Sequence, residues 1–382
     1  MVLMRSNLFR LHLRSNLTIM QRLLVWCFAV SFFLGSSQEM LSSTFLDVNY
    51  FKGTIPLHNN DILHLIKGHP EGIIIGWNHR TNGRNDWEQR CNYPDYGASF
   101  MYQDLKNEVL GNTFGFYGHF NFYFFKRRLM LRIGQGIVFA SNPYDKTSNP
   151  KNIAFGSKLL GSPYLMLNYK KPNLLGPIGI QSGLVFFHAS NGNFRAPNTS
   201  VNTIAFNMGI NYDLGTKKII YETPKEMPVI SKALKYNIVL RTGINQTDVV
   251  GSKQYPFYTV SAYVDKRFNF SSAIQFGVDA FFSFALKEEI KYRSVAFPET
   301  PSDPNADHRR VGGFLGYELF VNKWSMVAQT GYYLYYPYDF EGRIYNRLGL
   351  KYYFSKQWFG AFTVKSHLAT AEALEFGIGI RL

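Results

Sequence analysis

The chain has 382 residues, of which 46% are hydrophobic, 17% are aromatic and 18% are charged, and its formal net charge is +15. A basic chain can bind nucleic acid, but no basic helix or zinc-ligand pattern accompanies this charge, so we expect no nucleic-acid partner. Attraction to the anionic phosphates of lipids explains the positive charge better if the protein is exported to a membrane.

The first 37 residues are typical of an export signal peptide. Several arginines precede a short apolar run at 23–34, and Gly35-Ser36-Ser37 provides a small-residue cleavage site. About twelve apolar residues are too few to cross a bilayer comfortably as a helix. Translation can start at Met1 or at Met20. We therefore predict a signal peptide over 1–37.

Alternation of apolar and polar residues is the dominant pattern after the signal. In 112–126, for example, Phe114, Phe116 and Phe120 fall on one face, and Tyr117 and His119 fall on the other. Candidate strands lie near residues 44–53, 71–80, 95–104, 112–126, 128–140, 158–170, 176–190, 201–213, 234–245, 255–267, 271–286, 311–321, 324–337, 343–355, 357–366 and 373–382. The first two are weak, so we expect about 14–16 strands.

These strands indicate an all-β fold, a transmembrane antiparallel β-barrel. Such strands can cross a membrane only in a closed barrel, because open sheet edges would leave backbone groups without partners. An even number of strands places both termini in the periplasm. We expect one outer-membrane barrel domain over 38–382, with polar loops at 141–157, 214–232 and 287–310. The C-terminal strand would contact the outer-membrane assembly machinery.

Three polar side chains share the apolar face of two neighbouring predicted strands. In 176–190 the even positions carry mostly apolar residues together with His188 and Ser190, and in the next strand Asn202 lies on the corresponding face. Polar groups at a lipid boundary cost about 1–3 kcal/mol when they lack partners, so chance placement is disfavoured.

This arrangement can support nucleophilic catalysis on a lipid. A serine needs an adjacent base, and the base needs a third group that orients it, which are the roles we expect for Ser190, His188 and Asn202. The turn that follows contains Asn191, Gly192 and Asn198, whose amides and backbone N–H groups could bind an oxyanion. The plainer alternative is a polar pair that anchors the strand end near the lipid headgroups.

The segment HASNGNFRAPNTSVN, residues 188–202, resembles the signature of the outer-membrane lipid A 3-O-deacylases, the acyloxyacyl hydrolase-like family. The resemblance implies a barrel whose outer surface carries a Ser-His-Glu triad, with His188 as the base and Ser190 as the nucleophile. It also suggests Asn198 as an oxyanion-binding side chain. About the last hundred residues resemble longer family members from Bacteroidetes-type bacteria.

One position departs from the family pattern. The acid of the family lies fourteen residues after the histidine, where this chain has Asn202. An amide oxygen can orient the imidazole, but it cannot stabilise the imidazolium, and the comparable change in a serine protease costs about 10⁴ in rate.

The sequence therefore predicts an outer-membrane serine esterase in a Gram-negative bacterium. Its substrate would be an acyl ester of lipid A in lipopolysaccharide, at the 3-position if the resemblance holds, and it would need no metal or other cofactor. The alternative is a barrel without catalysis, either a porin-like channel or a structural lipid-binding protein.

Other polar residues have plainer interpretations. We expect Lys365, His367, Glu375 and Arg381 to form ion pairs inside the barrel. The histidines in 58–69 match no specific metal-ligand spacing.

Overall fold

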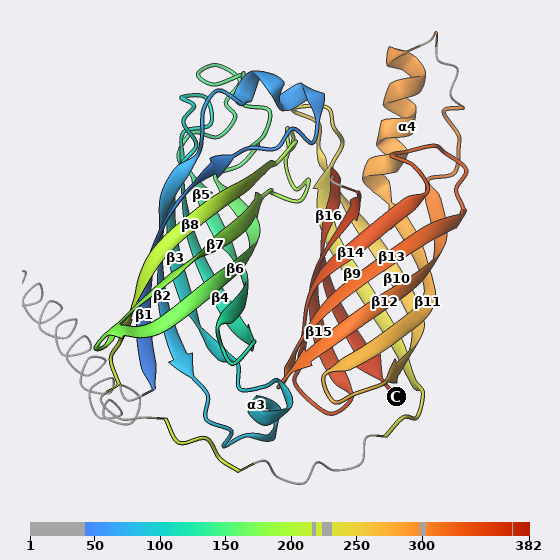
Figure 1. The fold of residues 1–382 in the computed structure, drawn as a ribbon. Helices are drawn as coiled ribbons and strands as arrows, with labels where there is room; N and C mark the ends of the chain where they lie inside the picture. Colours follow the sequence, from blue (N-terminus) through green and yellow to red (C-terminus); the bar gives the residue numbers. More distant parts are fainter. Residues whose placement is uncertain (1–42, 216–218, 224–230, 298, 300–302, 369) are drawn as a thin grey trace, which may run out of the picture.

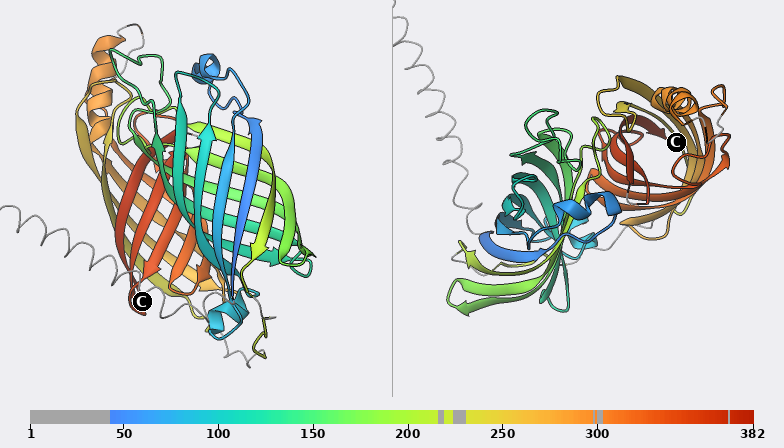
Figure 2. Two further views of the ribbon diagram at one scale, coloured as in Figure 1. Left: turned by 90° about the vertical axis from the view of Figure 1, so that its left-hand side faces the viewer. Right: turned by 90° about the horizontal axis from the view of Figure 1, so that it is seen from above.

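The computed structural model describes residues 43–215, 219–223, 231–297, 299, 303–368 and 370–382. The predicted signal peptide lies outside these residues. The described part is built almost entirely from sixteen antiparallel strands, which lie side by side as two groups of eight (Figures 1 and 2). Among the described residues, no helix is both long and apolar enough to cross a membrane.

The first eight strands close into one barrel, because β1 pairs with both β2 and β8, for instance at Val48 with Ile210. Its elements are β1 (Thr44–Thr54), η1 (Asn60–Leu65), β2 (Glu71–Arg80), α3 (Asp86–Arg90), β3 (Asp95–Asp104), β4 (Asn112–Phe124), β5 (Leu129–Ala140), β6 (Leu159–Leu175), β7 (Ile178–Ala189) and β8 (Val201–Asp213).

The second barrel closes in the same way, by pairing β16 with β9 at Gly379 and Val239. Its elements are β9 (Lys235–Gln246), β10 (Gln254–Arg267), β11 (Ser272–Ser283), α4 (Phe284–Ala296), β12 (Arg309–Val321), β13 (Trp324–Tyr335), β14 (Ile344–Tyr353), β15 (Trp358–His367) and β16 (Thr370–Arg381).

The predicted all-β, antiparallel barrel fold is confirmed. The structure has sixteen strands, the upper end of the expected 14–16, because the two weak N-terminal candidates are strands. The prediction of one continuous barrel over 38–382 is wrong, because β1 pairs with β8 and not with β16. The segment 214–232, which we expected to be a loop, lies between the two barrels in sequence. Alternation defines the two faces of a strand, but it does not define which distant strand completes the barrel.

A second difference concerns 287–310, predicted as a loop, where the chain instead forms most of α4. Ser283 accepts a hydrogen bond from the backbone N–H of Leu286 and so caps the first turn. Lys291 pairs with Glu288 at 3.0 Å, and Arg293 pairs with Glu289 at 2.6 Å, which are spacings that stabilise a helix.

Both barrels are apolar outside, and both enclose buried charged side chains together with a buried apolar and aromatic cluster. In the first, Arg132 is buried and binds Asp47 at 2.6 Å. In the second, buried Arg347 binds Asp279 at 2.9 Å and Glu375 at 2.6 Å. The outward faces carry exposed aromatic and aliphatic side chains such as that of Phe116, which is 63% exposed. This is the pattern of strands that face lipid on one side and a polar interior on the other.

The expected ion pairs inside the barrel are confirmed, and they lie in the second barrel. Lys365 and His367 both contact Glu372, and Glu375 binds Arg347. Arg381 binds Asp265 at 2.6 Å near the end of the barrel. Buried charges of this kind are stable only when they are paired, so these residues have a structural role.

The alternation of strand directions gives the molecule two distinct ends. The connections that contain η1, residues 190–200 and α4 lie at one end, and α3 and the C-terminus lie at the other (Figure 1). The first of these is called the η1 end below, and the second the α3 end.

Candidate active site

His188 and Asn202 face each other across the pairing of β7 with β8. The imidazole Nδ1 lies 2.7 Å from the Oδ1 of Asn202. Because a carbonyl oxygen only accepts hydrogen bonds, Nδ1 is the donor here, and the neutral ring keeps its lone pair on Nε2. The amide thus selects the tautomer in which Nε2 can act as a base.

The pair lies on the outward face of the first barrel, as the alternation predicts. On the same face, the exposed side chains of Leu184 in β7 and of Ile204 and Phe206 in β8 follow in register. The polar pair therefore lies at the η1 end of an apolar surface, where it can meet the headgroup region of a lipid.

Ser190 follows β7 directly, and its backbone is bridged to Gly161. Three hydrogen bonds surround its Oγ. The backbone N–H of Gly192 and the Nδ2 of Asn198 each donate to Oγ at 3.0 Å, and Oγ lies 3.1 Å from the Oδ1 of Asn198. Two donors thus converge on the oxygen that would carry the nucleophilic lone pair.

In this conformation the serine hydroxyl is held by Asn198 and not by His188. Among the residues that the structure describes, no hydrogen bond joins Ser190 to His188, and Ser190 is only 5% exposed. Catalytic hydrogen bonds are often long or absent without substrate and form only in the substrate complex. A change of the Ser190 rotamer and a small opening of the following turn are the movements that catalysis would require.

The predicted oxyanion-binding residues divide into two kinds. Gly192 and Asn198 aim donors at the Ser190 oxygen. Asn191 supports the turn instead, since its N–H donates to the Oδ1 of Asn198 at 3.0 Å and its Nδ2 donates to the carbonyl of Arg195 at 2.6 Å. Its Nδ2 is therefore occupied within the turn, while among the described residues its buried Oδ1 has no hydrogen-bond partner.

The second barrel holds this turn from the other side. The Oε1 of Gln246 in β9 accepts from the N–H of Ala196 at 2.8 Å, and the Gln246 backbone exchanges bonds with Asn193. Gln254 donates to the carbonyl of Phe194 at 2.7 Å. We did not predict these contacts, because no sequence signal links a turn in one barrel to a strand in another.

Gly192 fits closely against the same barrel. Its φ is +64°, a conformation that favours glycine, and a Cβ built there would lie 2.4 Å from the Cγ of Leu374. The turn that presents the Gly192 N–H to Ser190 is thus shaped both by its own backbone and by the second barrel.

The histidines of the connection between β1 and β2 lie at the same end and bind backbone carbonyls. The Nε2 of His58 is 3.0 Å from the carbonyl of Thr199, and the Nε2 of His64 is 2.9 Å from that of Lys151. The first contact joins the η1 region to the segment that follows Ser190, and the second joins it to the connection between β5 and β6. Within the described residues, no group of three or more potential metal ligands is found.

The fold is that of a membrane β-barrel, and its candidate site combines a histidine on the outward face with a buried serine in the turn that follows. Residues 71–211 match the family model of the lipid A 3-O-deacylases (PagL), and residues 234–382 match that of the acyloxyacyl hydrolase C-terminal domain. The two matches fall on the first and the second barrel. The chain belongs to the lipid A 3-O-deacylase, or acyloxyacyl hydrolase-like, family.

No curated protein matches the chain. Among solved structures, a mutant of the Rhodopseudomonas blastica porin is similar at 10% identity with a TM-score of 0.20, and it covers 89% of this chain and 99% of the porin. A triple mutant of that porin is similar at 8% identity with a TM-score of 0.17 and the same coverage.

Proposed function

We propose that this protein is an outer-membrane serine esterase of a Gram-negative bacterium that removes an ester-linked acyl chain, at the 3-position, from lipid A of lipopolysaccharide. The observation that carries the proposal is the His188–Asn202 pair on the outward, apolar face of β7 and β8, followed at once by the buried Ser190, in a chain of this family. A lipid ester is the abundant substrate that reaches such a surface directly.

The orientation in the membrane agrees with this substrate. An outer-membrane barrel with periplasmic termini has its odd-to-even connections outside. The connection between β7 and β8 is one of these, so Ser190 would lie at the outer leaflet, where lipid A resides.

The first chemical step is acylation of the serine. The Oγ of Ser190 attacks the ester carbonyl while its proton passes to the Nε2 of His188. The Gly192 N–H and the Asn198 Nδ2, which donate to the Ser190 Oγ in this structure, would then turn to the oxyanion of the tetrahedral intermediate. Collapse breaks the ester C–O bond, and His188 returns the proton to the sugar hydroxyl.

Water completes the cycle. It attacks the acyl-enzyme, transfers a proton to the Nε2 of His188 and releases the fatty acid, after which Ser190 regains its proton. Asn202 keeps the imidazole in place throughout, but it brings no charge that would stabilise the imidazolium. The proposal therefore includes a rate below that of an enzyme with a carboxylate at this position.

Gln246 acts as a positioning residue in this scheme. It holds the backbone at Asn193 and Ala196, and the same turn presents Gly192 and Asn198 to Ser190. We infer that the second barrel serves catalysis by fixing the oxyanion-binding turn. The C-terminal strand would in addition contact the outer-membrane assembly machinery.

The competing function, a porin-like channel, is disfavoured by the buried side chains that occupy both interiors. Arg132 crosses the first barrel to Asp47, and Arg347 crosses the second to Asp279. We expect no conductance in planar bilayers.

The proposal is tested with purified protein in detergent, by measuring the fatty acid released from lipid A. Ser190→Ala should abolish the release. Ser182→Ala is the matched control, because Ser182 lies on the same face of β7, and it should leave the rate unchanged. Equal release from the wild type and Ser190→Ala would reject the proposed nucleophile.

A further inference from the structure

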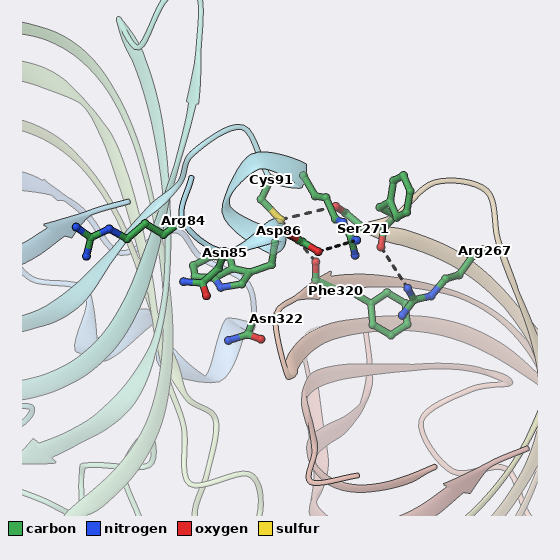
Figure 3. A pocket seen from close by; sticks show the side chains of 11 residues that line it. Arg84, Asn85, Asp86, Cys91, Arg267, Ser271, Phe320 and Asn322 are labelled. Atoms are coloured by element: carbon green, nitrogen blue, oxygen red, sulfur yellow. Dashed lines mark hydrogen bonds and ion pairs between the residues drawn. The ribbon is translucent and has the colours of Figure 1, made fainter. Parts of the chain in front are cut away.

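A cavity of about 420 Å³ lies between the two barrels (Figure 3). It is at the α3 end, whereas Ser190 is at the η1 end. Its walls come from α3 and the residues around it, from the turn between β10 and β11, and from the turn between β12 and β13. These are even-to-odd connections, whereas Ser190 lies in an odd-to-even connection. The cavity and Ser190 are therefore at opposite ends of the barrels, and in a membrane they would face opposite leaflets.

Residues that line this cavity connect the two barrels through contacts of Cys91. The Sγ of Cys91 is 3.7 Å from the Oγ of Ser271 and 3.8 Å from the carbonyl of Phe320 (Figure 3). Cys91, which follows α3, thus contacts the second barrel. The two sides of the cavity are held together by these contacts and by the stacking of Arg90 on Phe270.

Two of the arginines that line the cavity, Arg90 and Arg267, are stacked on aromatic rings and give it positive charge. The guanidinium carbon of Arg90 lies 4.4 Å from the ring centroid of Phe270, and that of Arg267 lies 3.9 Å from that of Phe320. Stacking on an aromatic ring fixes the plane of a guanidinium and leaves its N–H groups directed outward from its edge.

Both guanidiniums have unused hydrogen-bonding capacity. Arg90 has one carboxylate partner, Asp86, at 3.5 Å, and Arg267 donates to the carbonyl of Phe270 at a long 3.4 Å. The Nε atoms of both arginines are buried and, among the described residues, have no hydrogen-bond partner. A guanidinium has five N–H donors, so most of the donors beside this cavity remain available.

An anion with several oxygens satisfies such donors, and phosphate does so through paired hydrogen bonds to the planar arginine fork. Among the described residues that line the cavity, Asp86 is the only carboxylate, and it is already paired with Arg90. The side chains of Trp87 and Phe270 form an apolar part of the cavity wall. The cavity therefore suits an amphipathic ligand with an anionic group and a hydrocarbon part.

The position of the cavity relative to the strands indicates which kind of anion can reach it. The cavity lies between the barrels, at the ends of strands whose outward faces are apolar, so in a membrane it would lie close to the lipid headgroups. We propose that this cavity binds the phosphodiester headgroup of a glycerophospholipid from the leaflet opposite to Ser190. The lipid would fill the space between the barrels. This inference does not depend on the chemistry at Ser190.

The test measures the lipid that remains bound after purification in mild detergent, by native mass spectrometry and phosphorus analysis. We expect the wild type to retain a glycerophospholipid, and Arg267→Gln to reduce the retained amount about tenfold, since one charge-assisted contact is lost. Arg309→Gln is the matched control, because Arg309 is exposed at the η1 end. Equal retention by the wild type and Arg267→Gln would overturn the proposal, as would retention of lipid A instead.

Two further measurements keep the test decisive. Arg267→Lys keeps the charge without the planar fork, so it should retain an intermediate amount of lipid even if Arg267→Gln fails to fold, and retention equal to the wild type would contradict the proposed geometry. Delipidated wild type is then titrated with a short-chain phosphatidylcholine and with inorganic phosphate. We expect the lipid to bind at least tenfold more tightly, and equal affinities would identify a site for free phosphate instead.

Discussion

The imidazole of His188 is bound through Nδ1 to the amide oxygen of Asn202, 2.7 Å away, where the family pattern has a carboxylate. An uncharged partner orients the ring but does not compensate the positive charge that the ring acquires during catalysis. Asn202 thus holds the imidazole in the orientation that a base requires, but it does little to stabilise the imidazolium.

Asn202→Glu should therefore raise the rate of deacylation. Removal of the corresponding carboxylate in a serine protease costs about 10⁴ in rate, so we expect a gain of at least tenfold in kcat. Asn202→Gln is the control for the longer side chain and should give no gain. Unchanged or lower activity of Asn202→Glu, with the protein folded, would mean that another group supplies the acid.

Asn198→Ala should lower kcat by about 10²–10³, the usual cost of one lost oxyanion donor. The amide donates to the Ser190 oxygen at 3.0 Å, and it also holds the N–H of Asn191. Asn142→Ala, in the connection between β5 and β6 at the same end, is the control. Kinetics on purified lipid A check the prediction, and a change in KM alone would contradict the role of Asn198.

Gln246→Leu should lower kcat about tenfold with little change in KM, because the side chain acts through the turn and does not touch substrate. Gln246→Glu keeps an oxygen for the N–H of Ala196 and should restore most of the activity. Gln357→Leu, at an exposed position at the α3 end, controls for general effects on the second barrel. Full activity of Gln246→Leu would show that the second barrel does not position the site.

The two-barrel architecture predicts a specific crosslink. Val48 in β1 and Ile210 in β8 are register partners, so cysteines at both positions, in a Cys91→Ser background, should be joined by mild oxidation. Val48→Cys combined with Ile378→Cys should not crosslink, because β16 pairs with β9. The opposite result would indicate a single barrel of sixteen strands. Gel mobility of the oxidised proteins distinguishes the two outcomes.

The sequence predicted most of the fold and the face on which the site lies. Alternation identified the sixteen strands and placed His188 and Asn202 on one outward face, because strand periodicity is a local property. It could not show that β1 pairs with β8, since closure depends on which distant strand is available as a partner.

The contacts around the site could not be predicted from the sequence for a similar reason. The contact of Gln246 with Ala196 joins residues of different barrels, and no periodicity connects them. The hydrogen bonds of Ser190 to Asn198 depend on how the turn folds back, which the short motif suggests only through family resemblance.

The central claim is that Ser190 makes this protein a lipid A deacylase, and mass spectrometry of lipid A from cells tests it most directly. Cells that express the wild type should contain lipid A lacking one ester-linked acyl chain. Cells that express Ser190→Ala at the same level should contain only intact lipid A, and Ser182→Ala should resemble the wild type. Identical lipid A from the wild type and Ser190→Ala would contradict the claim.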